Sequence, residues 1–211
     1  MKLEKIEPLD SPNYLRLIFD DGKRLKAPAF KVVELGMKIG CDVSPADFLA
    51  LENAQSLASC KERAVRILTA SGLSKKELQK RLVQKGESEE DAEQAVLWLS
   101  ELHLIDDLET AKQLTRSAAL RGYGRARAKS ILYEKGIPRE FWDEALEELP
   151  EMDGAIDAFL RRKLEGKALD SKLIKKTVDA LLRRGHGYHD IQEGLRRFEA
   201  ELPENTWEDT Q

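Results

Sequence analysis

The chain lacks any apolar run long enough to cross a membrane. None of its 211 residues lies in such a stretch, whereas a membrane helix needs about 20 apolar residues in a row. The first residues, Met1-Lys2-Leu3-Glu4-Lys5, also lack the apolar core of a signal peptide. These absences predict a soluble, cytoplasmic protein with no membrane partner.

Cysteine and aromatic residues are scarce. The two cysteines, Cys41 and Cys60, are too few to form a disulfide framework, and we expect two small, buried or half-buried thiols. Aromatic residues make up 6% of the chain and charged residues 35%. This mixture is typical of solvent-exposed helices and argues against a large β-sandwich.

The sequence contains no recognisable catalytic arrangement. No Ser/His/Asp or Cys/His nucleophile pattern is present. Asp106 and Asp107 are a tempting pair for metal or acid–base chemistry, but Asp106 with Glu109 three residues later is a capping box at a helix start. His186 and His189 lack the further ligands of a metal site, apart from the neighbouring Asp190. We therefore expect a protein that is not an enzyme and has no cofactor or metal.

The segment Arg121-Gly122-Tyr123-Gly124-Arg125 allows two interpretations. It lacks the Lys-Ser/Thr ending and the preceding strand of a phosphate-binding loop. It is either a helix end followed by a tight turn, or a concavity of backbone and arginine groups that faces an anion such as a phosphate. The sequence alone leaves both open.

One short element occurs three times at nearly constant spacing. A leucine is followed by three residues that include a basic one and then by a glycine, at Leu82–Gly86, Leu132–Gly136 and Leu181–Gly185, so that the glycines lie 50 and 49 residues apart. Apolar residues recur 6, 10 and 13 positions after each glycine, which is the spacing of one helical face. They are Ala92, Trp142 and Ile191, then Val96, Leu146 and Leu195, then Leu99, Leu149 and Phe198. The pattern predicts tandem helical repeats, an architecture typical of elongated binding proteins.

We predict a mainly α-helical fold, with three-helix repeats in an elongated curved array after a small N-terminal segment that contains a β-hairpin. The expected divisions are an N-terminal extension over 1–58, repeats over 59–105, 106–152 and 153–202, and an acidic tail over 203–211. The hairpin is indicated by two β-prone segments on either side of Asp20-Asp21-Gly22-Lys23. A short helix over 30–37 should follow, then a helix start with Ser44 as its N-cap.

Within the repeats, helix boundaries follow from caps and breakers. The first helix of the first repeat should cover Cys60–Ala70, and capping boxes at Ser74 and Ser88 should begin its other two helices. The third helix of the second repeat should run from Pro138 to Leu149, and Ser171 should cap the middle helix of the third repeat. Trp98 and Trp142 should lie in the core, and Trp207 should be exposed.

Charge is segregated along the chain although its net value is only −4. Residues 86–109 contain nine acids and no lysine or arginine, whereas residues 111–139 contain eight bases and one acid. Alternating blocks of this strength suit a partner that is itself charged in patches. Arg125 and Lys129 lie four residues apart and share a helix face, whereas Arg127 points elsewhere. The basic stretch is either a solvated helix surface or, as we favour, a binding patch.

The ordered motifs resemble the RecX family of bacterial proteins that regulate the recombinase RecA. The resemblance covers about residues 60–200 and rests on Leu82–Gly86, Leu104-Ile105-Asp106-Asp107 with Ala111, Arg121-Gly122-Tyr123-Gly124 with Arg127, Leu132–Ile137, and Arg183-Arg184-Gly185. Thr110 and His186 depart from the family pattern, which usually has aromatic residues there. Both are packing positions.

The resemblance implies a protein that binds the RecA–DNA filament and modulates, usually inhibits, its ATPase and strand-exchange activities in DNA repair and recombination. RecA is then the partner, single-stranded DNA is a possible further one, and we expect a monomer. The expected contact residues are Arg116, Arg121, Arg125, Arg127 and Lys129, with Lys172, Lys175 and Lys176 as a second patch.

Two other kinds of protein compete with this interpretation. A transcriptional regulator built on three-helix units would bind DNA directly and would need a recognition helix that approaches the bases. The third helices of the first two repeats are acidic, with Glu90, Asp91 and Glu93 in one and Glu140, Asp143, Glu144 and Glu147 in the other, and would repel phosphate. A scaffold protein without nucleic-acid contacts is a further alternative that the sequence does not exclude.

Overall fold

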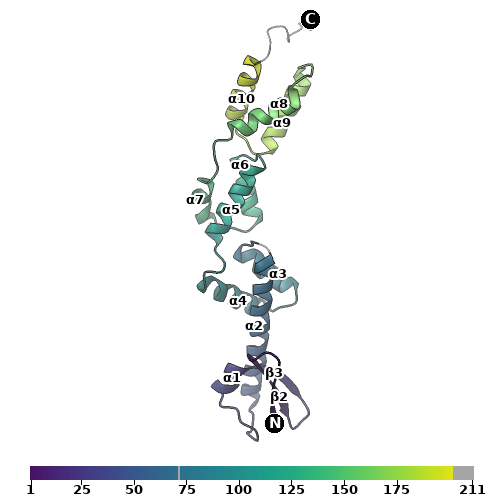
Figure 1. Cartoon of the computed structure of the whole chain (residues 1–211), viewed down its shortest axis with the longest axis vertical. Helices are drawn as coiled ribbons and strands as arrows, with labels where there is room; N and C mark the ends of the chain where they lie inside the picture. Colours follow the sequence, from purple (N-terminus) through teal and green to yellow (C-terminus); the bar gives the residue numbers. More distant parts are fainter. Residues whose placement is uncertain (71, 202–211) are drawn as a thin grey trace. The chain divides into compact units, whose positions relative to one another are not determined.

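A computed structural model describes residues 1–70 and 72–201 of the chain (Figure 1). They fall into two compact units, Met1–Ile105 and Asp106–Gln211, each of which is described by itself. The expected acidic tail over 203–211, with Trp207, lies outside the described residues. No helix in the described ranges is long and apolar enough to cross a membrane.

The first unit begins with an antiparallel sheet in the order β1-β2-β3. Its strands are β1 (Leu3–Pro8), β2 (Tyr14–Phe19) and β3 (Arg24–Pro28). The predicted hairpin is confirmed, because β2 pairs with β3 across the turn at Gly22. Strand β1 was not predicted. Its pairing with β2 places Leu3 opposite Phe19, and both side chains are fully buried.

Two helices follow the sheet. Helix α1 (Ala29–Glu34) is shorter than expected, since Gly36 takes a φ of 61° and ends the turn. Helix α2 (Pro45–Ala70) is one continuous helix of 26 residues. Ser44 caps it as predicted, by accepting a hydrogen bond from Asp47 N at 3.1 Å.

The predicted separate helix over Cys60–Ala70 is therefore wrong, because no glycine or proline interrupts the helix after Pro45. The division expected between 58 and 59 falls inside α2. This helix contributes Leu51 to the core of the sheet and Cys60 and Ala64 to the core of the first repeat.

The first repeat is completed by α3 (Lys75–Gln84) and α4 (Glu89–Glu101). Both predicted caps are confirmed, since Ser74 accepts from Glu77 N at 3.1 Å and Ser88 from Asp91 N at 3.0 Å. Trp98, which was expected in the core, packs half-buried against its edge.

The second unit opens with the second repeat. Its helices are α5 (Asp107–Leu120), α6 (Arg125–Glu134), the 3₁₀ turn η1 (Arg139–Phe141) and α7 (Trp142–Leu146). The third helix is thus shorter than the predicted span from Pro138 to Leu149, because the chain leaves the proline in a 3₁₀ turn. Trp142 packs half-buried against the core of this repeat.

The third repeat consists of α8 (Asp153–Leu164), α9 (Ser171–Arg183) and α10 (Tyr188–Ala200). Asp170 rather than Ser171 caps α9, by accepting a hydrogen bond from Leu173 N at 2.6 Å. A carboxylate is the stronger acceptor at a helix N-terminus, so the prediction was wrong by one residue.

The repeated element behaves as its spacing predicts. Leu82, Leu132 and Leu181 are fully buried, each in the core of its own repeat. The glycine that follows each of them has a positive φ and ends a helix. The predicted mainly α-helical fold of three-helix repeats, preceded by a small sheet, is confirmed. The elongated, curved arrangement of the repeats stays a prediction.

Candidate functional site

The basic residues that the sequence predicts as a contact surface lie in the second unit, on α5, α6 and α9 and, for Arg121, directly after α5. They differ in what they contact. Some are neutralised within their own repeat, and others are exposed without a partner among the described residues.

Arg116 on α5 belongs to the first group. Its guanidinium lies 2.8 Å from Glu109 Oε1 and 3.4 Å from Glu148 Oε2. The hydrogen bond from Arg116 also lowers the pKa of Glu109. Lys112 pairs in the same way with Glu144, at 2.7 Å. The acids at the third helix of this repeat therefore balance the bases of α5.

Arg125 and Arg127 on α6 also have local partners. Arg125 donates to the carbonyl of Leu146 at 3.5 Å, and Arg127 pairs with Glu134 at 2.9 Å. These contacts direct the two guanidinium groups along the protein surface. Each side chain is therefore positioned by a partner in its own repeat.

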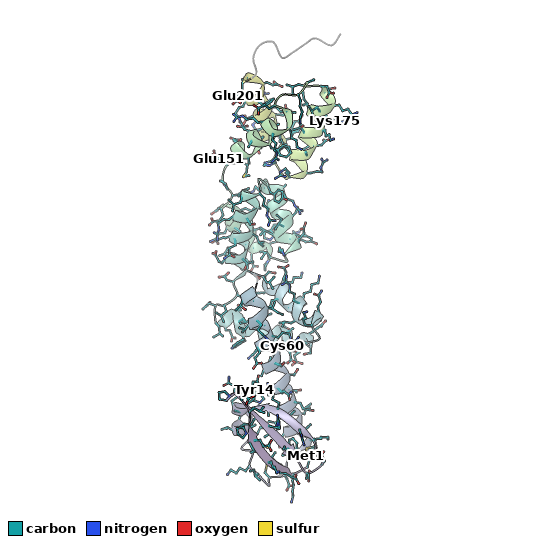
Figure 2. All side chains as sticks on the ribbon, turned by 45° about the vertical axis from the view of Figure 1, so that its right-hand side comes forward. Met1, Tyr14, Cys60, Glu151, Lys175 and Glu201 are labelled. Carbon is teal, nitrogen blue, oxygen red and sulfur yellow. The ribbon has the colours of Figure 1, made fainter. Side chains whose placement is uncertain are left out.

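Five predicted residues are exposed and make no side-chain hydrogen bond or ion pair within residues 1–70 and 72–201. They are Arg121, Lys129, Lys172, Lys175 and Lys176. Figure 2 shows Lys175 in the last bundle of helices. Arg183, at the end of α9, has the same exposure and was not among the predicted site residues, although the sequence marks it as part of a basic pair.

The segment Arg121–Arg125 is a junction between the second and third repeats. Gly124 N donates to Arg184 O at 2.9 Å, and Ala126 N donates to Gly185 O at 3.1 Å. Two of the N–H groups that would bind a phosphate at the start of α6, those of Gly124 and Ala126, are therefore occupied by the residues that follow α9. The interpretation as a helix end and tight turn describes the backbone, and only the Arg121 side chain stays open to an anion.

Two side chains that follow α9 in the third repeat also contact the segment Arg121–Arg125. The Arg184 guanidinium donates to the carbonyls of Arg121 and Gly122, and His186 Nε2 lies 3.1 Å from the same Gly122 oxygen. Arg184 also lies over the rings of Tyr123 and Phe159, at 5.0 and 5.4 Å from their centroids. The carbonyls of the two residues that follow α5 are thus paired with side chains from the segment that follows α9.

Both glycines of the junction are needed for this close approach. A Cβ on Gly124 would lie 2.4 Å from Gly185 O, and one on Gly185 would lie 2.2 Å from Arg127 N. Backbone atoms cannot yield at such distances. The contact holds the end of α9 against the start of α6, so the two predicted basic patches belong to one body.

The candidate metal-binding or acid–base residues Asp106, His186 and His189 have structural contacts. Asp106 accepts from Leu108 N at 2.8 Å and caps α5, as predicted, while Glu109 turns to Arg116 instead of closing the capping box. His186 is buried in the junction, and His189 contacts Glu193 at 3.3 Å. Within the described residues, no three His, Cys, Asp or Glu side chains are grouped to hold a metal ion.

Known proteins match both the repeats and the fold. Family models for the first and second three-helix domains of RecX match residues 60–99 and 106–146. Regulatory protein RecX of Cronobacter sakazakii is 32% identical over 157 residues, which are 65% of this chain and 91% of that protein. The chain belongs to the RecX family. RecX of Vibrio parahaemolyticus is 31% identical over 65% of this chain and 90% of its own length.

Two solved structures share the fold. A crystal structure of regulatory protein RecX covers 91% of this chain and 98% of its own, with a TM-score of 0.74 and 20% identity. RecX from Lactobacillus salivarius covers 70% of this chain and 99% of its own, with a TM-score of 0.59 and 20% identity. At this identity the likeness concerns the fold alone.

Proposed function

We propose that this protein binds the RecA–DNA filament and modulates, in the inhibitory direction, its ATPase and strand-exchange activities. It acts as a monomer in the cytoplasm, without a cofactor and without an enzymatic reaction of its own. Membership of a family of regulatory proteins supports the proposal, and the unpaired cations of the second unit carry it at residue level.

These cations favour a polyanionic partner. Lys129 on α6 and Lys175 and Lys176 on α9 face solvent without a counter-ion among the described residues, and the junction joins their two helices in one body. A surface of fixed, unpaired cations attracts a charged filament and speeds its encounter with the protein. Arg116 and Arg127, held by acids of their own repeat, contribute less to the binding energy than Arg121 and Lys129 do.

The charge of the third helices disfavours a transcriptional regulator that docks a recognition helix on DNA. Helix α4 begins with Glu89, Glu90 and Asp91, and α7 contains Asp143 and Glu144. Such helices repel the phosphates that flank a major groove. We therefore assign the contact with the filament to the second helices of the second and third repeats, α6 and α9.

The deciding experiment is an assay of RecA ATPase on single-stranded DNA with substoichiometric amounts of the protein. We expect the ATPase rate to fall and filaments to shorten. An unchanged ATPase rate together with an unchanged filament length would contradict the proposal. Specific binding to a duplex sequence in the absence of RecA would instead support the transcriptional regulator.

A charge-reversal variant tests the surface. Replacing Arg121, Lys129 and Lys175 by Glu should abolish the effect on RecA, because each position then carries a negative charge that repels the polyanionic filament. The matched control reverses three exposed bases of the first unit, Lys5, Lys38 and Arg66, and should keep most of the effect. Circular dichroism should show the same helicity for both. Full activity of the first variant would reject these residues as the contact surface.

A further inference from the structure

A polar groove in the first unit is separate from the basic surface of α6 and α9. It lies between the sheet, α2 and the turn that joins α3 to α4, and its volume is about 720 Å³. That volume lies within the range of ligand pockets, about 300–1,000 Å³. Residues 1–58, on which one side of the groove depends, precede the two matched family domains.

The floor of the groove is one face of α2. Glu52, Gln55, Ser59 and Arg63 follow each other at spacings of three or four residues and line the groove together. Apart from Arg63, which pairs with Glu87 at 2.5 Å, they offer hydrogen-bonding groups without apolar bulk. Glu52 is the one acid of the lining that has no counter-ion among the described residues.

Cations stand on both sides of this floor. Arg24 and Lys26 alternate with buried residues on β3, so both point to the outer face of that strand. Lys85, at the end of α3, stands on the opposite side with Gly86, where an added Cβ would meet nothing within 4 Å. Because Arg63 and Glu87 neutralise each other, three cations of the lining face one acid, and the lining residues carry a net positive charge.

One side of the groove is held in place by packing. The Lys26 ammonium lies 3.9 Å from the centroid of the Tyr14 ring. Tyr14 is almost fully buried, and burial together with the nearby Glu62 carboxylate of α2 raises the pKa of Tyr14 to about 12. Figure 2 shows Tyr14 at the end of the sheet nearest to the first repeat. The sheet, Lys26 and α2 are therefore fixed relative to one another, which lowers the cost of binding.

We propose that this groove binds the sugar-phosphate backbone of a single nucleic-acid strand, without sequence preference. Cations on two sides, which outnumber the single unpaired acid Glu52, and the neutral hydrogen-bonding groups of Gln55 and Ser59 between them suit a chain of phosphates. A protein partner would need exposed apolar or aromatic anchors, and the only large apolar residue of the lining, Leu25, is itself buried. The inference deepens the proposed function, on which it rests for the identity of the strand as the DNA of the filament.

The test measures binding of the full chain to oligo-dT in the absence of RecA, so its outcome is independent of the ATPase assay. Acetylation of lysines with and without oligo-dT, read by mass spectrometry, locates the strand. We expect Lys26 and Lys85 to be protected while Lys5 and Lys38 are not. Equal acetylation of Lys26 and Lys85 with and without the oligonucleotide would overturn the proposal.

A variant with Arg24, Lys26 and Lys85 replaced by Gln gives the second readout. Each phosphate contact adds about −0.7 to the slope of log K against log salt for single strands, so the slope should become shallower by about 2. Affinity at low salt should fall about tenfold. The control with Lys5, Lys38 and Arg66 replaced by Gln should bind as the unaltered protein does, and wild-type affinity and slope in the groove variant would reject the site.

Competition distinguishes other occupants of the groove. Inorganic phosphate or ADP that protects Lys26 and Lys85 where oligo-dT does not would make this a small-anion site and overturn the strand proposal. Protection by poly-glutamate but not by oligo-dT would overturn it in favour of an acidic protein segment. Protection by oligo-dT that persists at millimolar phosphate supports it.

Discussion

Arg184 donates from its Nε to the carbonyl of Gly122 at 3.3 Å, across the junction between the third and second repeats. In the opposite direction, Gly124 N donates to the carbonyl of Arg184 at 2.9 Å. Two segments about sixty residues apart thus exchange hydrogen bonds both ways. Each satisfies backbone groups that the helices of the other leave unpaired at their ends.

This reciprocity explains why a basic residue stands at Arg184. The carbonyls of Arg121 and Gly122, which directly follow α5, accept from Arg184, and its planar guanidinium reaches both of them at once. Lysine, with a single ammonium, does not reproduce that fork. The neighbouring Arg183 points to solvent and makes no such contact among the described residues.

Replacement of Arg184 by Ala should lower the free energy of unfolding by about 2 kcal/mol, the loss expected when charged hydrogen bonds to partly buried carbonyls disappear. Arg184→Lys should recover less than half of that loss. Urea denaturation followed by circular dichroism measures both. Arg183→Ala is the control and should stay within about 0.5 kcal/mol of the unaltered protein. An equal effect of the two alanine variants would show that the junction adds nothing to stability.

Gly124→Ala should destabilise the second unit by about 1–3 kcal/mol, the usual cost of overpacking a tight contact. The new methyl group would meet Gly185 O at 2.4 Å and His186 N at 2.7 Å, both backbone atoms. Gly154, at the start of α8, has no heavy atom within 4 Å of an added Cβ, so Gly154→Ala should be neutral or stabilise by up to about 1 kcal/mol. Thermal unfolding of the two variants compares them directly, and a Gly124→Ala protein as stable as Gly154→Ala would contradict the observed approach.

The parts of the fold that were predicted correctly depend on local signals. Ser44, Ser74, Ser88 and Asp106 cap the helices that they were expected to cap, because a capping bond joins residues two or three apart. The recurring leucines and the apolar residues 6, 10 and 13 positions after each glycine were identified from their spacing in the sequence, and Leu82, Leu132 and Leu181 are fully buried. These features need no knowledge of distant contacts.

The errors have two sources. The prediction ended one helix before Cys60, whereas α2 continues without interruption because no residue between Pro45 and Ala70 breaks a helix. Strand β1 forms only through pairing with β2, a contact that its own sequence does not specify.

The candidate site was harder to predict than the fold. The sequence locates the bases, but whether Arg116 is paired depends on Glu148, on another helix. The role of Arg184 and His186 depends on Gly122, more than sixty residues away. A single sequence carries no record of such long-range contacts, and the groove beside α2 requires three separate segments to be placed together.

The two cysteines should differ in reactivity. Burial, with Glu87 and Asp91 nearby, raises the pKa of the Cys60 thiol to about 11, and its side chain is fully buried. Cys41 is only half-buried. With a thiol-specific disulfide reagent at pH 8, we expect one fast reaction in the folded protein and two after denaturation. Cys41→Ser should remove the fast reaction, and a fast reaction that survives in that variant would show that Cys60 is accessible.

The junction should weaken in mild acid through His186. Burial lowers the pKa of His186 below its usual value of 6.5, and the nearby Arg184 charge lowers it further, while the hydrogen bond to Gly122 and the Asp190 carboxylate act in the other direction. The unfolded chain therefore binds a proton more readily than the folded one, so this stability is present above about pH 6.5 and is lost as the pH falls through the folded pKa. Thermal unfolding between about pH 7.5 and 5.5 should show a decrease in midpoint for the unaltered protein that His186→Gln largely removes. The carboxylates Asp21 and Glu109, whose pKa values are lowered from 3.8 and 4.5, titrate below this window. An unchanged pH dependence in His186→Gln would assign the acid sensitivity to another group.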